Sequence, residues 1–490
     1  MGLRRGIRRI AARIVAASLV TGGSTLLGSL LGSVALVEQG CVQEAPKPSA
    51  EAPIVVGVSF GLTGDLASFS APLRDAVRTA EGVINAGGGL LGRQVRFDIV
   101  DDQSDEQTFV VDTARSFADR GVAAVIGPVS SGQVKLTHQI FADRQIIQIS
   151  PAATSVELTD IQPAADRFFF RTTPADDFQG AAVILFAAKT PGGLGDAGAG
   201  GDADGGTGAT CNRLALVYID NPYGTSMAKV VSDNFPKRGV PGQRSIASQQ
   251  KIPLEARANY DDIIPGIIAS EPECLALISY DPAAAQFIKD FKKNPGYAAL
   301  EQKGFFFIGT DGMFTQGFLD LSLTDPSNPA SASTAEGVFG TNPDTQPGTT
   351  EYNAFKTIYG TYFPLGSAAD APAFAANTFD AAILIAFAIQ KAGSATDRIA
   401  IREALKEVSK PGGRPIGPAE ITEGFAELRN GRDIDYKGAS GSVDFQDTGN
   451  VPGGFIIWQA VREKPGDPVT YKTVARLGID ELVQQLEQIR

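Results

Sequence analysis

The chain has very few of the residues that build metal and redox centres. Its 490 residues include a single histidine, His138, three cysteines, three methionines and one tryptophan. Because histidine and cysteine supply most ligands of zinc and other transition metals, a centre of that kind is not expected. We therefore expect neither a metal ion nor a cofactor.

Two short acidic segments are the remaining candidates for a calcium ion. The run DDQSD spans residues 101–105, and Asp202-Ala-Asp204-Gly resembles part of a calcium-binding loop without its terminal glutamate. The first run has a simpler interpretation, because Ser104 and Gln107 have the spacing of a capping box that opens a helix. We expect solvated loops at both places.

Positive charge is also scarce. The chain has 43 lysine and arginine residues against 55 aspartate and glutamate residues, which gives a formal net charge of -12 at pH 7. A surface with this excess of negative charge repels phosphate backbones. Nucleic acid is therefore not an expected partner.

Long apolar runs are missing as well, except near the start of the chain. There, a basic stretch precedes a run of apolar and small residues from Ile14 to Val37, followed by Glu-Gln-Gly-Cys. This order is typical of an export signal. A permanent membrane span is the alternative because the run is long enough, although many glycines and serines dilute its hydrophobicity.

Cys41 resembles the lipidated cysteine of a bacterial lipoprotein, although Glu38 and Gln39 depart from the small apolar residues usual before it. We predict an export signal at residues 1–41 and a tether rich in proline and alanine at 42–52. The expected location is periplasmic or otherwise extracytoplasmic, with a membrane anchor at Cys41.

The rest of the chain alternates short apolar runs with helical patterns. Continuous apolar runs are typical of buried parallel strands, and they occur at 54–60, 122–128, 146–150, 213–220, 274–281 and 305–311. The sequence therefore predicts an α/β protein with two doubly wound parallel-sheet lobes. We assign 53–174 and 343–440 to lobe I, and 175–342 and 441–490 to lobe II. A three-stranded hinge is expected near Pro174, Thr341 and Ser440.

Polar and aromatic side chains follow several of these strands directly. Ligands of open α/β sheets bind beyond the carboxyl ends of the strands, so these residues predict a binding cleft between the lobes. An ordinary helix cap is the alternative for each serine and threonine. The residues are Ser130, Ser131, Ser150, Thr154, Tyr223, Tyr280 and Asp311.

Cys211 and Cys274 each stand at the start of a predicted strand. The two strands should be neighbours in a doubly wound sheet, and an exported protein meets an oxidising compartment. We predict a disulfide between them, with two buried thiols as the alternative.

Seven segments, taken in order, resemble the leucine/isoleucine/valine-binding family of type I periplasmic solute-binding proteins, which serve ABC transporters. The resemblance covers about Pro53 to Val408. The segments are GLTGDLASF (61–69), INAGGGLLGRQV (84–95), VAAVIGPVSSG (122–132), ISPAATSVELT (149–159), FRTTPADDFQG (170–180), YIDNPYGTSMA (218–228) and FFIGTDGMF (306–314).

The resemblance implies roles for individual residues. Ser131 would donate to a ligand carboxylate, and Ala152, Ala153 and Thr154 would form a second donor cluster, with the Ala152 carbonyl available to an ammonium group. Asp311 would hold that ammonium group. The aromatic walls would be Tyr223, Tyr280, Phe69 and Phe374; core packing is the alternative for the two phenylalanines.

The resemblance therefore implies a monomeric receptor that captures an amino acid, closes, and delivers it to the membrane permease of an ABC transporter. The same fold serves ligand sensors that act through a signalling partner, which is the second hypothesis. Catalysis would need a triad of Ser131, His138 and Asp143, but the chain has no nucleophile-elbow motif. We do not expect an enzyme.

Overall fold

The computed structural model describes residues 51–188, 211–365 and 371–489, all of which belong to the unit Ala45–Arg490. The predicted export signal, Cys41, most of the tether and the segment with Asp202 and Asp204 lie outside the described residues. Within those ranges no helix is long and apolar enough to cross a membrane. The same ranges contain no group of three or more His, Cys, Asp or Glu side chains placed to hold a metal ion.

The first lobe is built on a parallel sheet with strand order β2-β1-β3-β4-β5. Strand β1 (Ile54–Phe60), which lies between β2 and β3, is almost entirely buried, as expected for a strand covered by helices on both faces. The other strands are β2 (Val95–Asp101), β3 (Val125–Ile126), β4 (Gln148–Ser150) and β5 (Phe169–Arg171). The helices of this segment are α1 (Ala67–Ala86), α2 (Phe109–Arg120) and α3 (Ser131–Asp143).

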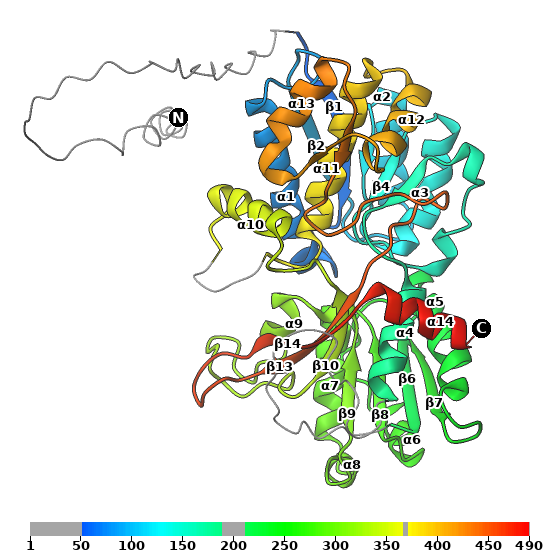
Figure 1. Ribbon diagram of the computed structural model, residues 1–490. Helices are drawn as coiled ribbons and strands as arrows, with labels where there is room; N and C mark the ends of the chain where they lie inside the picture. Colours follow the sequence, from blue (N-terminus) through cyan, green and yellow to red (C-terminus); the bar gives the residue numbers. More distant parts are fainter. Residues whose placement is uncertain (1–50, 189–210, 366–370, 490) are drawn as a thin grey trace, which may run out of the picture. The chain divides into compact units, whose positions relative to one another are not determined.

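A later part of the chain completes the first lobe, and Figure 1 shows these yellow and orange helices beside the blue ones. Helix α11 (Ala375–Ala392) is buried along nearly its whole length because it packs against α1, α12 and α13. The returning elements are α10 (Thr350–Tyr362), α12 (Arg398–Val408), α13 (Ile421–Arg429), β11 (Arg414–Ile416) and β12 (Ile434–Tyr436).

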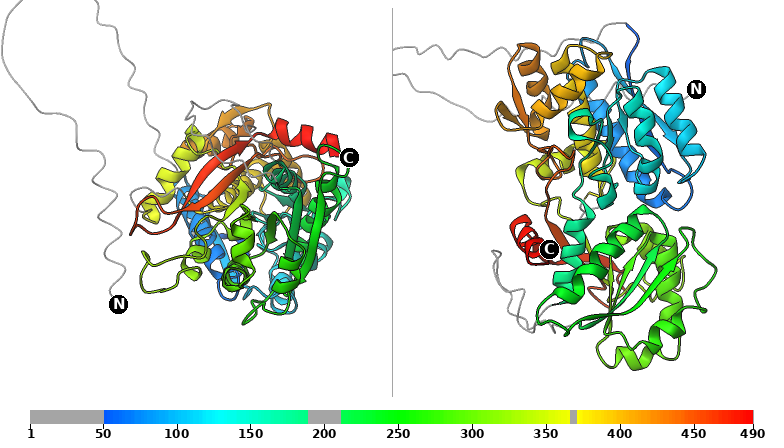
Figure 2. Two further views of the ribbon diagram at one scale, coloured as in Figure 1. Left: turned by 90° about the horizontal axis from the view of Figure 1, so that it is seen from below. Right: turned by 90° about the vertical axis from the view of Figure 1, so that its right-hand side faces the viewer.

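The second lobe contains a seven-stranded sheet of order β14-β13-β10-β9-β8-β6-β7. Strands β6 to β10 run parallel, whereas β13 and β14 pair antiparallel along one edge and appear in red in Figure 2. The strands are β6 (Arg213–Ile219), β7 (Ser245–Ile252), β8 (Cys274–Ile278), β9 (Phe306–Gly309), β10 (Phe339–Pro343), β13 (Phe455–Val461) and β14 (Thr470–Leu477).

Helices cover this second sheet, and short 3-10 turns connect several elements of both lobes. The helices are α4 (Asp176–Ala187), α5 (Pro222–Asn234), α6 (Ile264–Ala269), α7 (Asp281–Lys293), α8 (Tyr297–Glu301), α9 (Gln316–Leu321) and α14 (Ile479–Ile489). The turns are η2 (Val156–Leu158), η3 (Ala164–Asp166), η4 (Phe235–Lys237), η5 (Asp311–Met313) and η6 (Pro418–Glu420).

The last passage between the lobes lies further along the chain than the sequence predicts. Val443, Phe445 and Val451 belong to the hydrophobic core of the first lobe, so the predicted boundary at 440/441 is wrong. Their segment forms no strand and is held by its buried side chains. The chain crosses at Gly453, where an added Cβ would approach Cγ of Pro174 to 2.8 Å, so the first and last crossings lie side by side.

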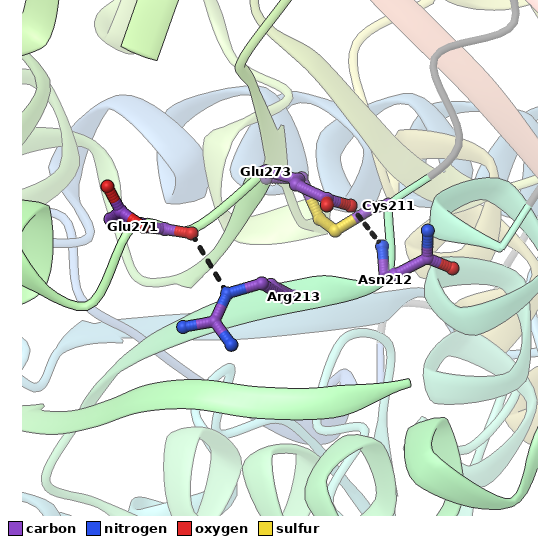
Figure 3. Close-up of a disulfide and its surroundings, with 6 residues drawn as sticks. Cys211, Asn212, Arg213, Glu271 and Glu273 are labelled. Atoms are coloured by element: carbon purple, nitrogen blue, oxygen red, sulfur yellow. Dashed lines mark hydrogen bonds between the residues drawn. A yellow bond between two sulfur atoms is a disulfide. The ribbon is translucent and has the colours of Figure 1, made fainter. Parts of the chain in front are cut away.

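The predicted disulfide is present and joins Cys211 to Cys274 (Figure 3). It links the amino ends of β6 and β8, which pair in register from Leu214 and Cys274 onward. Polar contacts flank it, with the Asn212 amide donating to the Glu273 carboxylate at 2.5 Å. The bridge therefore stands at the edge of the sheet opposite to the carboxyl ends of the same strands.

Candidate functional site

A pocket forms where the carboxyl ends of both sheets face each other. It has about 260 Å³ of empty space, with open solvent at its mouth included. Seven of the nine residues expected from the sequence line it, together with Val129 and Gly312. The lining residues are Phe69, Val129, Ser131, Ala152, Thr154, Tyr223, Tyr280, Asp311 and Gly312.

On the side of the first lobe, Ser131 lies in the first turn of α3. The helix cap is the preceding residue, Ser130, whose hydroxyl accepts from the backbone of Gln133 in a complete capping box. Ser131 therefore does not cap α3, which was the alternative role that the sequence left open for it. Its hydroxyl accepts from the Ser155 amide at 3.1 Å, and the helix start places partial positive charge beside the pocket.

The loop carrying Ala152 and Thr154 is held from behind by Arg171. This fully buried guanidinium donates to the carbonyl oxygens of Ala153 at 3.2 Å and Ser155 at 2.9 Å. Ala153 thus turns its carbonyl toward the core and does not line the pocket, in contrast to its predicted contact role. The buried charge of Arg171 thus sets the orientation of two carbonyl groups of this loop.

On the side of the second lobe, Asp311 opens η5 just after β9. Its carboxylate accepts from the Tyr223 hydroxyl at 2.7 Å, and that hydroxyl also lies 2.6 Å from Oγ1 of Thr310. Burial raises the pKa of the Asp311 carboxyl above its usual value, and the donors Tyr223 and Gln179 offset only part of that effect. No cation among the described residues pairs with it, since it forms no ion pair there.

Asp176, at the start of α4, is a second buried acid that the sequence interpretation missed. It is fully buried, and neither carboxylate oxygen accepts a hydrogen bond of acceptable geometry. Burial and the neighbouring Asp311 raise the pKa of its carboxyl well above the usual value, although the Thr154 hydroxyl and Arg171 act in the opposite direction. A signal was available, because Asp176 follows β5 closely within FRTTPADDFQG.

Aromatic side chains close the pocket from both lobes. Tyr223 and Tyr280 stack with ring centroids 5.5 Å apart, and Phe69 contacts Phe374 at 5.2 Å. Phe374 does not line the pocket, so its predicted role as a wall is indirect and it supports Phe69 from the core.

Gly312 is required by close packing, since an added Cβ would lie 2.5 Å from the Ser279 carbonyl oxygen.

The remaining residues singled out in the sequence lie elsewhere. The Nδ1 atom of His138 is 3.4 Å from the Gln162 amide, and no hydrogen bond among the described residues joins His138 to Ser131. Helix α2 begins at Phe109, with the Asp105 carboxylate accepting from its amide, so the predicted capping box of Ser104 and Gln107 is wrong. Ser104 instead donates to the carbonyl oxygen of Thr63.

Residues 53–428 match a protein family described as periplasmic binding protein. The chemotactic signal transduction system substrate-binding protein BasB of Halobacterium salinarum is 25% identical over 417 residues, which cover 83% of this chain and 87% of that relative. The Leu/Ile/Val-binding protein BraC3 of Rhizobium johnstonii is 24% identical over 389 residues, which cover 78% of this chain and 89% of BraC3.

Solved structures with the same architecture include the leucine binding protein LivK of Thermotoga maritima. It matches with a TM-score of 0.64 and 18% identity, covering 87% of this chain and 99% of LivK. A solute binding protein of an ABC transporter from Rhodopseudomonas palustris, in complex with 3,4-dihydroxybenzoic acid, matches with a TM-score of 0.62 and 16% identity, covering 87% and 98%. These likenesses confirm the predicted fold, the type I periplasmic binding protein fold.

Proposed function

The chain belongs to the periplasmic binding protein family, with Leu/Ile/Val-binding proteins among its relatives, and on that premise we propose that it captures an amino acid. Family and fold are those of extracytoplasmic binding proteins rather than enzymes. In this proposal the two lobes close around the solute, and the closed protein delivers it to the membrane permease of an ABC transporter.

The observation that carries the proposal is the division of charge across the pocket. The first lobe offers the Ser131 hydroxyl, the Thr154 hydroxyl and the start of α3, all of which suit a carboxylate. The second lobe offers Asp311 with Asp176 behind it, two buried acids that form no ion pair among the described residues, although Arg171 acts on Asp176 from a distance. A zwitterion supplies both missing charges, because its ammonium group pairs with the acids and its carboxylate meets the donors.

The same division argues against a ligand that carries only a carboxylate. The R. palustris structure holds 3,4-dihydroxybenzoic acid, which has no ammonium group. In the present pocket such a ligand would leave Asp176 and Asp311 buried and unpaired, which costs several kcal/mol unless they take up protons. The apolar side of the pocket, formed by Phe69, Val129 and Tyr280, favours an aliphatic or aromatic side chain on the solute.

Calorimetry on protein freed of bound solute tests the proposal. Leucine, its analogue without the amino group (4-methylpentanoate) and its analogue without the carboxylate (3-methylbutylamine) form a matched set. We expect measurable binding of leucine or another amino acid, and a loss of at least about 100-fold for both analogues, since each leaves buried groups unpaired. Equal affinity for 4-methylpentanoate would contradict the role of the acids, and no binding across an amino-acid panel would reject the proposal.

A sensor role is the second candidate, and the similarity to BasB supports it. In that case the closed protein would dock on a transmembrane signalling receptor instead of a permease. Crosslinking of the ligand-bound protein in its native membrane, followed by identification of the bound partner, separates the two roles.

We also propose that residues 1–41 direct export and that Cys41 carries a lipid anchor. Mass spectrometry of the mature amino terminus, compared with that of Cys41→Ala, tests this step. An unmodified amino terminus at another residue would reject the anchor and leave the binding function untouched.

A further inference from the structure

Asp281 links the two lobes outside the pocket. It stands at the start of α7 in the second lobe, and its side chain is buried, with 2% of the residue exposed. Its Oδ2 atom accepts from the hydroxyl of Ser68 in α1 of the first lobe at 2.6 Å, and from the hydroxyl of Thr315 in its own lobe at 2.6 Å. Its Oδ1 atom has no hydrogen-bond partner among the described residues.

Glu106 makes a similar link from the first lobe. Its Oε1 atom accepts from the side-chain amide of Asn221, the cap of α5 in the second lobe, at 3.2 Å. The Ser130 hydroxyl donates to the same oxygen atom. Neither Glu106 nor Asp281 lines the pocket, so both act on the contact between the lobes rather than on the solute.

Among the residues that the structure describes, the groups that face these two carboxylates carry no positive charge. Around Glu106 they are Asp102 and Asp105 on the same loop, Ser130, Asn221 and Tyr280. Around Asp281 they are Ser68, Thr315 and the Tyr471 phenol from β14. Among the described residues neither acid forms an ion pair. Contact between the lobes therefore buries two acids with hydroxyl and amide donors but without a counter-ion.

This burial has a defined electrostatic consequence. It raises the pKa of the Asp281 carboxyl to about 6 and raises the pKa of the Glu106 carboxyl, because the hydroxyl donors only partly compensate for lost solvation. Separation of the lobes would expose both carboxyl groups to water and lower their pKa toward ordinary values, although Asp102 and Asp105 would stay beside Glu106. The closed form therefore binds protons more tightly than the open form, and lowering the pH favours closure.

We propose that closure of the lobes is coupled to proton uptake at Glu106 and Asp281, so that lowering the pH shifts the empty protein toward its closed form. The proposal rests on the proposed function only in that the two lobes open and close. It does not depend on which solute is captured.

The experiment measures the distance between fluorescent labels placed on the two lobes of the empty protein. For Asp281 alone, a shift of the carboxyl pKa to about 6 raises the ratio of closed to open protein by about tenfold between about pH 7.5 and about pH 5. Glu106 adds to this response, and so do the pocket acids Asp176 and Asp311. An unchanged ratio in the unaltered protein would overturn the proposal.

Variants assign the response to the two acids. In Asp281→Asn combined with Glu106→Gln, the pH response should shrink by about tenfold or more, because neutral amides keep acceptor oxygens without titrating. Asp380→Asn is the matched control, since burial raises the pKa of Asp380 as well but its hydrogen-bond partners Tyr436, Ala439 and Ser440 all lie in the first lobe. A control that loses as much response as the double variant would overturn the proposal.

Two further measurements test the contact between Ser68 and Asp281 and separate this proposal from the proposed function. Ser68→Ala removes only the cross-lobe donor to Asp281 and should lower the closed fraction at both pH values, and no change would contradict the link. Calorimetry with amino acids is carried out on the same samples. A pH response without amino-acid binding would reject the proposed function alone, whereas amino-acid binding without a pH response would reject this proposal alone.

Discussion

The two lobes use the same kind of sheet but present opposite chemistry to the pocket. The first lobe contributes hydroxyls, a helix start and a loop fixed by Arg171, all of which favour negative charge. The second contributes Asp311, Asp176 and the phenol of Tyr223. Neither surface alone complements a dipolar solute. The comparison indicates that recognition requires both lobes, which is why closure and binding should be coupled.

The lobes also differ in how they are held together away from the pocket. The second lobe has the disulfide of Cys211 and Cys274, and the first lobe has the buried helix α11 that returns from a distant part of the chain. A covalent bond thus stabilises the second lobe, whereas burial of an apolar helix stabilises the first. Variants that remove one feature at a time show whether stability and binding are separate properties.

Removing the disulfide should have the largest effect. In Cys211→Ser combined with Cys274→Ser, the free energy of unfolding of the second lobe should fall by up to about 4 kcal/mol, given a sequence separation of 63 residues. Urea titration measures the loss. Amino-acid affinity under folding conditions should be unchanged, because the bridge stands at the amino ends of β6 and β8, and a drop in affinity would show that the two ends of the sheet are coupled.

Asp311→Asn should weaken amino-acid binding by about 100-fold or more, or about 3 kcal/mol, because an ammonium group would lose its buried charged partner. Calorimetry measures the change. Asp290→Asn is the matched control, since Asp290 is a buried acid of α7 that accepts from the Tyr260 amide within the second lobe. Unchanged affinity in Asp311→Asn would remove that residue from the site.

Ser131→Ala should reduce affinity by about tenfold, because one hydroxyl contact to the solute carboxylate is lost. The comparison is with Thr349→Ala, which removes a helix cap of α10 and should cost about 1 kcal/mol of stability without changing affinity. Ligand titrations on both variants measure whether the Ser131 hydroxyl contributes to amino-acid affinity. An equal, small effect on affinity would mean that the Ser131 hydroxyl serves only the Ser155 amide.

The smallest expected effect separates the two phenylalanines. Phe69→Leu changes the pocket wall and should alter affinity several-fold, whereas Phe374→Leu lies behind it and should change affinity less than about threefold. Thermal unfolding of both variants should show losses of about 1 kcal/mol or less. An effect of Phe374→Leu on affinity larger than about threefold would show that Phe374 contacts the solute after all.

Most of the fold and much of the site were accessible from local sequence features. Ser131, Thr154, Tyr223, Tyr280 and Asp311 each follow a predicted strand, and parallel strands carry their following residues to one edge of a sheet. Asp176 follows a strand in the same way but was passed over, since nothing local distinguishes an acid that caps a helix start from one buried without a partner. Its burial depends on which side chains the opposite lobe and the loop at Thr154 place around it.

The sequence by itself determined the order of strands and helices, the neighbouring strands that allow the disulfide, and the residues at the strand ends, because periodicity and local chemistry act over a few positions. The tertiary structure alone decided that Phe374 lies behind Phe69 and that the last crossing comes at Gly453. It also decided that Glu106 and Asp281 meet the opposite lobe. Such contacts join residues more than a hundred positions apart, and only packing selects them.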